Sequence, residues 1–372
     1  MLDSKNIKMN VKDLSRLLSQ IWPLGYAEDY DNVGLIVGNP SIEVTGVLVC
    51  HDALEVCIDE AILKKCNVVV CFHPIVFSGL KKLTGNSYVE RAVIKAIKNE
   101  VSIYAIHTAL DNFPQGVNKI MCDRLGLMNS KVLIPKENYI KKLVTFTPEQ
   151  NFHDLREALF SAGAGSIGNY DKCSFSSDGV GTYRGGDDSN PVVGAKHEFM
   201  QGNEKKLEVT FEKHLQNKIL NALFTHHIYE EVAYEIYTLD NPHQNIGLGR
   251  IGFFDEPMDE VYFLNHVKTT FGCGIIRHSA FLGKKIQKVA VLGGSGASGI
   301  KEALRQGADA YLTADLKYHD FYSAENQMLL CDIGHYESER FTKNYIVDIL
   351  KEKIPNFAII LSEQNTNPVK YF

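Results

Sequence analysis

The sequence has 372 residues, of which 45% are hydrophobic and 23% are charged, and this composition is that of an ordinary globular protein. The length exceeds that of a typical single domain, so we expect two or three compact units. The formal net charge of −6 argues against a surface devoted to nucleic acid, and a nucleic-acid partner is not expected.

Signals for secretion or membrane insertion are not expected either. Residues 1–6 lack the apolar core of a secretory signal, and no later run is long enough to span a bilayer. The eight cysteines include no Cys-x-x-Cys pair, and several lie in apolar strand-like runs, which is typical of reduced and buried thiols. We therefore expect a cytoplasmic protein with no membrane partner.

Strands and helices alternate in the N-terminal part of the chain. Helical spacing of apolar residues predicts a helix over residues 8–20. Continuous apolar runs predict buried strands that end near residues 50, 71 and 106, with helices over 55–64 and 88–99 between them. Apolar strands that alternate with helices indicate a sheet covered on both faces.

Imidazoles and carboxylates stand where these strands end. The same is true of a late segment, in which the strand 330–333 and a glycine turn lead into a helix. The side chains concerned are His51, Asp52, His73, His107, Asp111, His335 and Glu339. Because ligands bind at the carboxyl edge of open α/β sheets, we expect these groups to converge, and a divalent cation would satisfy them together. Mixed nitrogen and oxygen donors suit zinc, iron, manganese or nickel.

The middle of the chain changes character. Strands are predicted at residues 140–146, 206–212 and 232–237, helices at 152–162 and 215–224, and short polar strands at 173–176 and 181–183. This β-α-β-β-α-β-like order predicts an inserted ferredoxin-like α+β domain over residues 137–242.

The C-terminal part repeats the α/β rhythm. A linker of low apolar content follows residue 243, and then helices are predicted at 260–270 and 300–306 with strands at 288–292 and 308–313. The glycine-rich loop 293–298 opens one of these helices, so its backbone N–H groups could hold an anion such as phosphate. We predict one bilobed, three-layer α/β metal-binding domain, made of residues 1–136 and 243–372 and split by the insert.

Six motifs, taken together and in this order, resemble the NIF-three-like dinuclear metal-centre family, whose members are often labelled GTP cyclohydrolase I type 2 homologues. They are Asp31-Asn32-Val33-Gly34-Leu35, His73-Pro74-Ile75-Val76-Phe77, His107-Thr108-Ala109-Leu110-Asp111, Gly293-Gly294-Ser295-Gly296, Thr313-Ala314-Asp315-Leu316-Lys317-Tyr318-His319 and Gly334-His335-Tyr336-Glu337-Ser338-Glu339. The insert resembles the PII-like domain of the longer members. The resemblance implies a homo-hexameric toroid with two divalent metal ions per subunit, held by His73, Asp111, His335 and Glu339.

One position departs from the family pattern. The family has two adjacent histidines before a proline, whereas here Phe72 precedes His73, and phenylalanine cannot bind a metal. His51 ends the preceding strand, and neighbouring strands lie about 4.8 Å apart, so its imidazole could reach the vacated position. We therefore hypothesise that His51 is also a metal ligand. The alternative is a strand-end histidine bonded to a backbone carbonyl.

The residues and the resemblance together predict a metal-dependent hydrolase that acts on a nucleotide-like small molecule. In it, Glu339 bridges the metals and His319 is a proton donor. By resemblance, the reaction is opening of the imidazole ring of GTP. Two roles stay open: His319 alternatively belongs to a polar loop, and His107 is either a ligand or the partner of one. The alternative function is a non-catalytic metal-binding regulatory or storage hexamer with a ligand-sensing insert.

Overall fold

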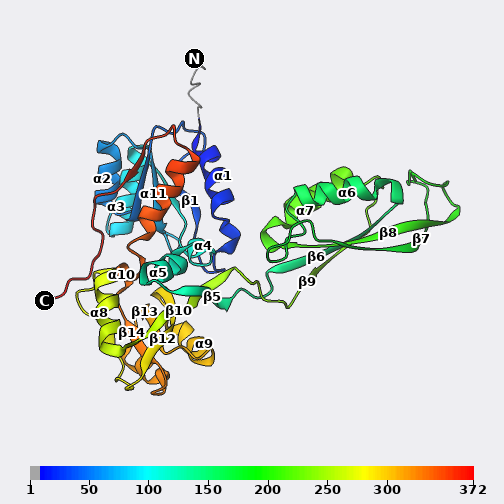
Figure 1. The fold of residues 1–372 in the computed structure, drawn as a ribbon. Coiled ribbons are helices and arrows are strands. Elements are labelled where there is room, and N and C mark those ends of the chain that lie inside the picture. The colour runs from blue at the N-terminus through cyan, green and yellow to red at the C-terminus, as the bar shows by residue number, and fades with distance from the viewer. Residues whose placement is uncertain (1–8) are drawn as a thin grey trace, which may run out of the picture. The chain divides into compact units, whose positions relative to one another are not determined.

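The computed structural model describes residues 9–372, so the N-terminal residues 1–6 and the start of the helix predicted at 8–20 lie outside the described residues. In the described part, no helix combines the length and the apolar character needed to cross a membrane. The chain divides into two compact units, Met1–Ile134 with Ile246–Phe372, and Pro135–Asn245. The fold is mixed α/β with three sheets (Figure 1).

The first sheet of the larger unit has the order β1-β4-β3-β2-β15. Its strands are β1 (Gly34–Val37), β2 (Val47–Asp52), β3 (Val68–His73), β4 (Ser102–Ala105) and β15 (Ile359–Leu361). All neighbours run parallel except β1, which is an antiparallel edge strand. Helices α1 (Val11–Ile21) and α11 (Thr342–Lys353) cover one face, and α2 (Glu55–Leu63) and α3 (Tyr88–Lys98) cover the other. The predicted sheet covered on both faces is confirmed.

The second sheet of this unit has the order β11-β14-β13-β12-β10-β5. Its strands are β5 (Met128–Pro135), β10 (Gly247–Asp259), β11 (Arg277–His278), β12 (Lys285–Ser295), β13 (Ala310–Ala314) and β14 (Leu329–Asp332). The central strands β12, β13 and β14 are parallel. Helices α5 (Val117–Leu125) and α8 (Glu260–Phe271) pack on one face, and α9 (Ile300–Arg305) packs on the other.

One expectation for this half is wrong. The stretch after residue 243, which was expected to be a linker, contains the long strand β10, and β10 pairs antiparallel with β12. Its glycines and its proline lower the intrinsic strand propensity of the segment. Pairing with a buried neighbouring strand, which the local sequence does not reveal, outweighs that propensity.

The second unit is a four-stranded antiparallel sheet of order β7-β8-β6-β9 with two helices. Along the chain its elements are β6 (Ile140–Thr147), α6 (Glu149–Ser161), β7 (Phe175–Arg184), β8 (Phe199–Glu212), α7 (Gln216–His226) and β9 (Tyr234–Thr238). The two short polar strands expected at 173–176 and 181–183 are in fact the single strand β7. Its ladder with β8 continues through Gly179 and Gly181, where the sequence pattern suggested a break.

Short elements complete the chain. Two short α-helices are α4 (Thr108–Asp111), which follows β4, and α10 (His335–Glu339), which follows β14. The 3-10 turns are η1 (Leu24–Tyr26), η2 (Lys213–Leu215), η3 (Ala297–Gly299) and η4 (Tyr318–Ala324). All eight cysteines are free thiols, and all but Cys173 are buried.

Candidate metal centre

The parallel pair β2 and β3 positions the first part of the site. In the register of this pair, Asp52 lies opposite His73. Because successive side chains on a strand point to opposite faces, His51 and Asp52 leave β2 on different sides. The ring of Phe72 stacks on His51, with centroids 5.4 Å apart and an interplanar angle of 28°. Phe72 therefore holds an imidazole in place although it cannot bind a metal itself.

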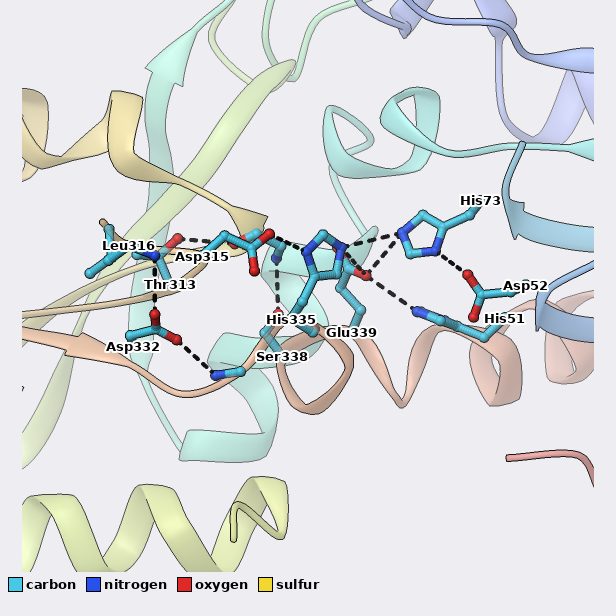
Figure 2. A network of polar contacts seen from close by, with 12 residues as sticks. His51, Asp52, His73, Thr313, Asp315, Leu316, Asp332, His335, Ser338 and Glu339 are labelled. Atoms are coloured by element: carbon cyan, nitrogen blue, oxygen red, sulfur yellow. Dashed lines mark hydrogen bonds and ion pairs between the residues drawn. The ribbon is translucent and has the colours of Figure 1, made fainter. Parts of the chain in front are cut away.

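Helix α10 brings the second part. His335 and Glu339 are four residues apart and share one face of this helix. Glu339 Oε2 lies 3.3 Å from His51 Nε2, 3.2 Å from His73 Nε2 and 3.3 Å from His335 Nε2. Figure 2 shows the three imidazoles pointing toward this one carboxylate from two sides. The carboxylate is buried, with only 4% of its side chain exposed.

Several polar atoms of this cluster have no hydrogen-bond partner among residues 9–372. They are Glu339 Oε2, both ring nitrogens of His51 and Asp111 Oδ1, all of them buried, although imidazole nitrogens approach Glu339 closely. Buried polar atoms are nearly always hydrogen-bonded, so four such atoms close to one site need an explanation. One donor atom from each of His51, His73 and Glu339 lies within 4.8 Å of the others. These lone pairs fit a divalent cation.

Carboxylates hold the far nitrogens of these rings. His73 Nδ1 donates to Asp52 Oδ1 at 2.8 Å, and His335 Nδ1 donates to Asp315 Oδ2 at 2.7 Å. A carboxylate on Nδ1 fixes the ring orientation and leaves Nε2 as the donor to a metal, which is the usual arrangement around metal-binding histidines. The two Nε2 atoms lie 3.4 Å apart.

The charges at this site favour protonated imidazoles around an ionised Glu339. Burial alone lowers the pKa of His73, but the charge of Glu339 and the hydrogen bond to Asp52 outweigh it and raise the pKa to about 9. Burial also lowers the pKa of His335, but its hydrogen bond to Asp315 and the adjacent charge of Glu339 raise the pKa to about 11. Burial raises the pKa of Glu339, yet the surrounding imidazoles hold it well below the usual value. Positive charge around Glu339 is therefore strongly favoured.

Asp111, the last residue of α4, is half-buried near the cluster. Burial, followed by the charge of Glu339, raises its pKa well above the usual value, whereas His73 and His335 act in the opposite direction. The structure thus brings His51, His73, His335 and Glu339 into contact, and Asp111 interacts electrostatically with the last three of these. His107 lies beside the cluster, with its ring centroid 5.4 Å from that of His73, and its Nδ1 donates to Asp31 Oδ1 at 2.7 Å.

His319 has a different environment. It is exposed on η4, and its ring contacts are with Tyr318 and Tyr322, at centroid distances of 5.2 and 6.2 Å. Within residues 9–372, no hydrogen bond, ion pair or ring contact joins His319 to the cluster. Its role as a proton donor stays a prediction.

The glycine-rich loop supports Glu339. The N–H of Gly293 donates to Asn118 Oδ1 at 3.0 Å, and that of Gly294 donates to Ser338 Oγ at 2.9 Å. Two of the amides expected to bind an anion are therefore satisfied within the protein. Gly294 has a φ of +66°, and a Cβ there would lie 2.4 Å from Glu339 Oε1. The loop requires glycine at this position because Glu339 packs directly against it.

A cavity of about 330 Å³ adjoins the cluster, and the C-terminal residues 367–369 and 371 form part of its wall. Sequence reasoning missed this contribution, together with Thr366, which donates to Asp52. Asp31 and Asp315 accept hydrogen bonds from the imidazoles of His107 and His335. Both carboxylates lie within the motifs quoted above, so the sequence did contain a sign that they belong to the site. Nothing in the sequence links residue 366 to residue 52.

Comparisons with known proteins agree over almost the whole chain. The family model described as Duf34/NIF3 (NGG1p interacting factor 3) matches residues 9–368. A relative from Bacillus subtilis named "GTP cyclohydrolase 1 type 2 homolog" is 34% identical over 369 residues, covering 98% of this chain and 99% of the relative. A relative of the same name from Halalkalibacterium halodurans is 35% identical over 367 residues, or 97% and 99%. The crystal structure of a Bacillus cereus protein related to NIF3 superposes with a TM-score of 0.84 at 36% identity, covering 98% and 99%.

Proposed function

This chain belongs to the Duf34/NIF3 family, and from that premise we propose that it binds two divalent metal ions and hydrolyses a nucleotide-like small molecule. One observation carries the proposal: three imidazole nitrogens lie 3.2–3.3 Å from Glu339 Oε2, a buried oxygen that has no hydrogen-bond partner in the described part of the chain. The name of the relatives makes GTP the first nucleotide to test.

Each donor has a proposed role. His51, His73 and His335 would supply Nε2 atoms, Asp111 would supply Oδ1, and Glu339, whose Oε2 lies between the imidazoles, would be the carboxylate that both metals share. The donor set suits zinc, iron, manganese or nickel. A cation held there would supply Lewis acidity, which polarises the bond under attack and acidifies a water molecule.

The remaining groups orient the site. Asp52 and Asp315 hold the far nitrogens of His73 and His335, so these rings keep Nε2 directed at Glu339. Arg277 and Tyr336 line the adjoining cavity, where a substrate would bind. His319 is the proposed proton donor; it is exposed on η4 and is not among the residues that line this cavity.

We also propose that the larger unit is a bilobed, three-layer domain and that the insert is ferredoxin-like, of the PII type. The strand order β7-β8-β6-β9 within a β-α-β-β-α-β chain supports the second part. A homo-hexamer and a cytoplasmic location complete the proposal. The free cysteines support a reducing compartment.

Metal content and turnover test this function. We would purify the full chain from cells grown with zinc, iron, manganese and nickel, measure metal by mass spectrometry, and assay GTP and simple phosphodiesters. We expect two metals per chain in the wild type and fewer than one in Glu339→Gln. Glu260→Gln is the matched control, because Glu260 is also a buried carboxylate and its two oxygens accept from the backbone amides of Leu282 and Gly283, not from the imidazoles of the cluster. Absence of metal from the wild type, or full occupancy in Glu339→Gln, contradicts the proposal.

A second candidate is a non-catalytic regulatory or storage assembly. The observation that favours it is a cavity of about 690 Å³ within the inserted unit, lined by β7 and by residues 189–192 and 229–231. Bound metal without turnover of any nucleotide would support this candidate over the hydrolase.

A further inference from the structure

The C-terminal segment is anchored although it forms no helix or strand after β15. Ser362 Oγ donates to Glu60 Oε2 at 2.6 Å, Thr366 Oγ1 donates to Asp52 Oδ2, and Asn367 Nδ2 donates to Glu337 Oε1 at 3.1 Å. Ser362 is 2% exposed and Thr366 is 7% exposed. Terminal residues are usually poorly ordered unless side-chain contacts hold them in place. Here the second of the three contacts, from Thr366 to Asp52, is made beside the histidine cluster.

Asp52 divides its two oxygens between the cluster and this segment. Oδ1 accepts the N–H of His73 Nδ1 at 2.8 Å, and Oδ2 accepts the hydroxyl of Thr366. The carboxylate is partly exposed, at 27%, and stands at the last residue of β2, so the ladder does not restrain its side chain. The hydroxyl of Thr366 therefore restrains the rotation of the group that holds His73.

A second carboxylate beside the cluster has the same arrangement. Asp31 Oδ1 accepts from His107 Nδ1, while Oδ2 accepts from the backbone N–H of Thr108 at 3.1 Å and from its hydroxyl. Thr108 follows the histidine directly, so that restraint is local. For Asp52 the restraining threonine lies 314 residues along the chain. The C-terminal segment is thus part of the support of the site.

We propose that Thr366 is a positioning residue that holds Asp52 and, through it, keeps the ring of His73 with Nε2 toward Glu339. The inference rests on the proposed function, because His73 acts there as a metal ligand. Loss of a group that orients a metal-binding histidine typically costs about 10–100-fold in affinity. Thr366 acts one residue further out, so we expect a loss of about 3–10-fold.

Cobalt binding tests the proposal on the full chain. We would titrate metal-free protein with Co²⁺ and follow the visible d–d spectrum of the wild type, Thr366→Val, Thr366→Ser and Ser362→Ala. Valine keeps the shape of threonine and removes only the hydroxyl, serine restores it, and Ser362→Ala loosens the same segment away from Asp52. We expect weaker binding and an altered spectrum in Thr366→Val alone. The proposal is overturned if Thr366→Val binds Co²⁺ as tightly as the wild type. It is also overturned if Ser362→Ala loses as much Co²⁺ affinity as Thr366→Val.

A metal-free measurement separates this inference from the proposed function. In the ¹⁵N-histidine-labelled protein without metal, the ring nitrogen signals of His73 report the hydrogen bond between Nδ1 and Asp52. We expect them to move in Thr366→Val, to return in Thr366→Ser and to stay unchanged in Ser362→Ala. If the wild type binds no Co²⁺, the metal function fails, and the ring signals still decide: a shift confined to Thr366→Val supports positioning, and unchanged signals refute it.

Discussion

Substitution of Gly294 by alanine distinguishes an effect on metal affinity from an effect on the stability of the fold. A Cβ at this position would lie 2.4 Å from Glu339 Oε1, whereas ordinary contacts begin at 3.4 Å, so the carboxylate must move by about 1 Å. The φ of +66° adds a backbone cost of about 1–2 kcal/mol for a residue with a side chain. We expect this loss in the free energy of unfolding, together with a separate loss of metal affinity because Glu339 leaves its place among the imidazoles.

Gly307→Ala is the matched control. Its φ is +68°, and no atom of residues 9–372 lies within 4 Å of the added Cβ, so this variant has the same backbone cost without the collision. Urea unfolding of the metal-free proteins should give similar losses for both variants. Zinc affinity, measured by competition with a chromophoric chelator, should fall about tenfold or more in Gly294→Ala only, which corresponds to about 1.4 kcal/mol. Equal zinc affinity in the two variants would refute the role assigned to Glu339.

Three further predictions use the same protein. His51→Ala should hold fewer than two metals per chain and lose about 1–2 kcal/mol of unfolding free energy, since a buried ring stacked on Phe72 is removed; two metals per chain by mass spectrometry would exclude His51 as a ligand. Removal of metal with EDTA should lower the melting temperature by about 5 °C, because a metal at a hundred times its Kd stabilises by about 2.7 kcal/mol, and an unchanged scanning-fluorimetry midpoint would argue against a structural metal. Burial raises the pKa of Glu60, but bonds from Ser362, Glu363 and Lys64 outweigh it and hold the pKa below the usual 4.5. Its stabilisation should therefore be present above pH 4.5 and lost as pH falls through the lower folded-state pKa, and Glu60→Gln should flatten that part of the urea-unfolding profile against pH.

Much of the larger unit could be predicted because its strands are continuous apolar runs. The runs that end at Cys50 and Cys71 correspond to β2 and β3, and the helices that follow these strands begin at the expected residues, Glu55 and Tyr88. Strand β10 was missed because its glycines and Pro257 suppress the local signal, and the pairing that forms it is made with β12, far along the chain. The expected break in β7 failed for the same reason, since its register is set by β8.

The candidate site shows the same division. The sequence shows that three histidines stand beside strand ends, namely His51, His73 and His335. It does so because a buried parallel strand is a continuous apolar run, and the polar residues that follow the strand come directly after that run. Which ring nitrogen faces Glu339, and which carboxylate holds the other nitrogen, depends on groups that meet only after folding. The support of Asp52 by Thr366 is the clearest case, since a hydrogen bond between residues 314 positions apart leaves no local pattern. The sequence alone therefore determined the donors and the strand ends that carry them, whereas the tertiary structure decided their orientation, because orientation is set by long-range contacts.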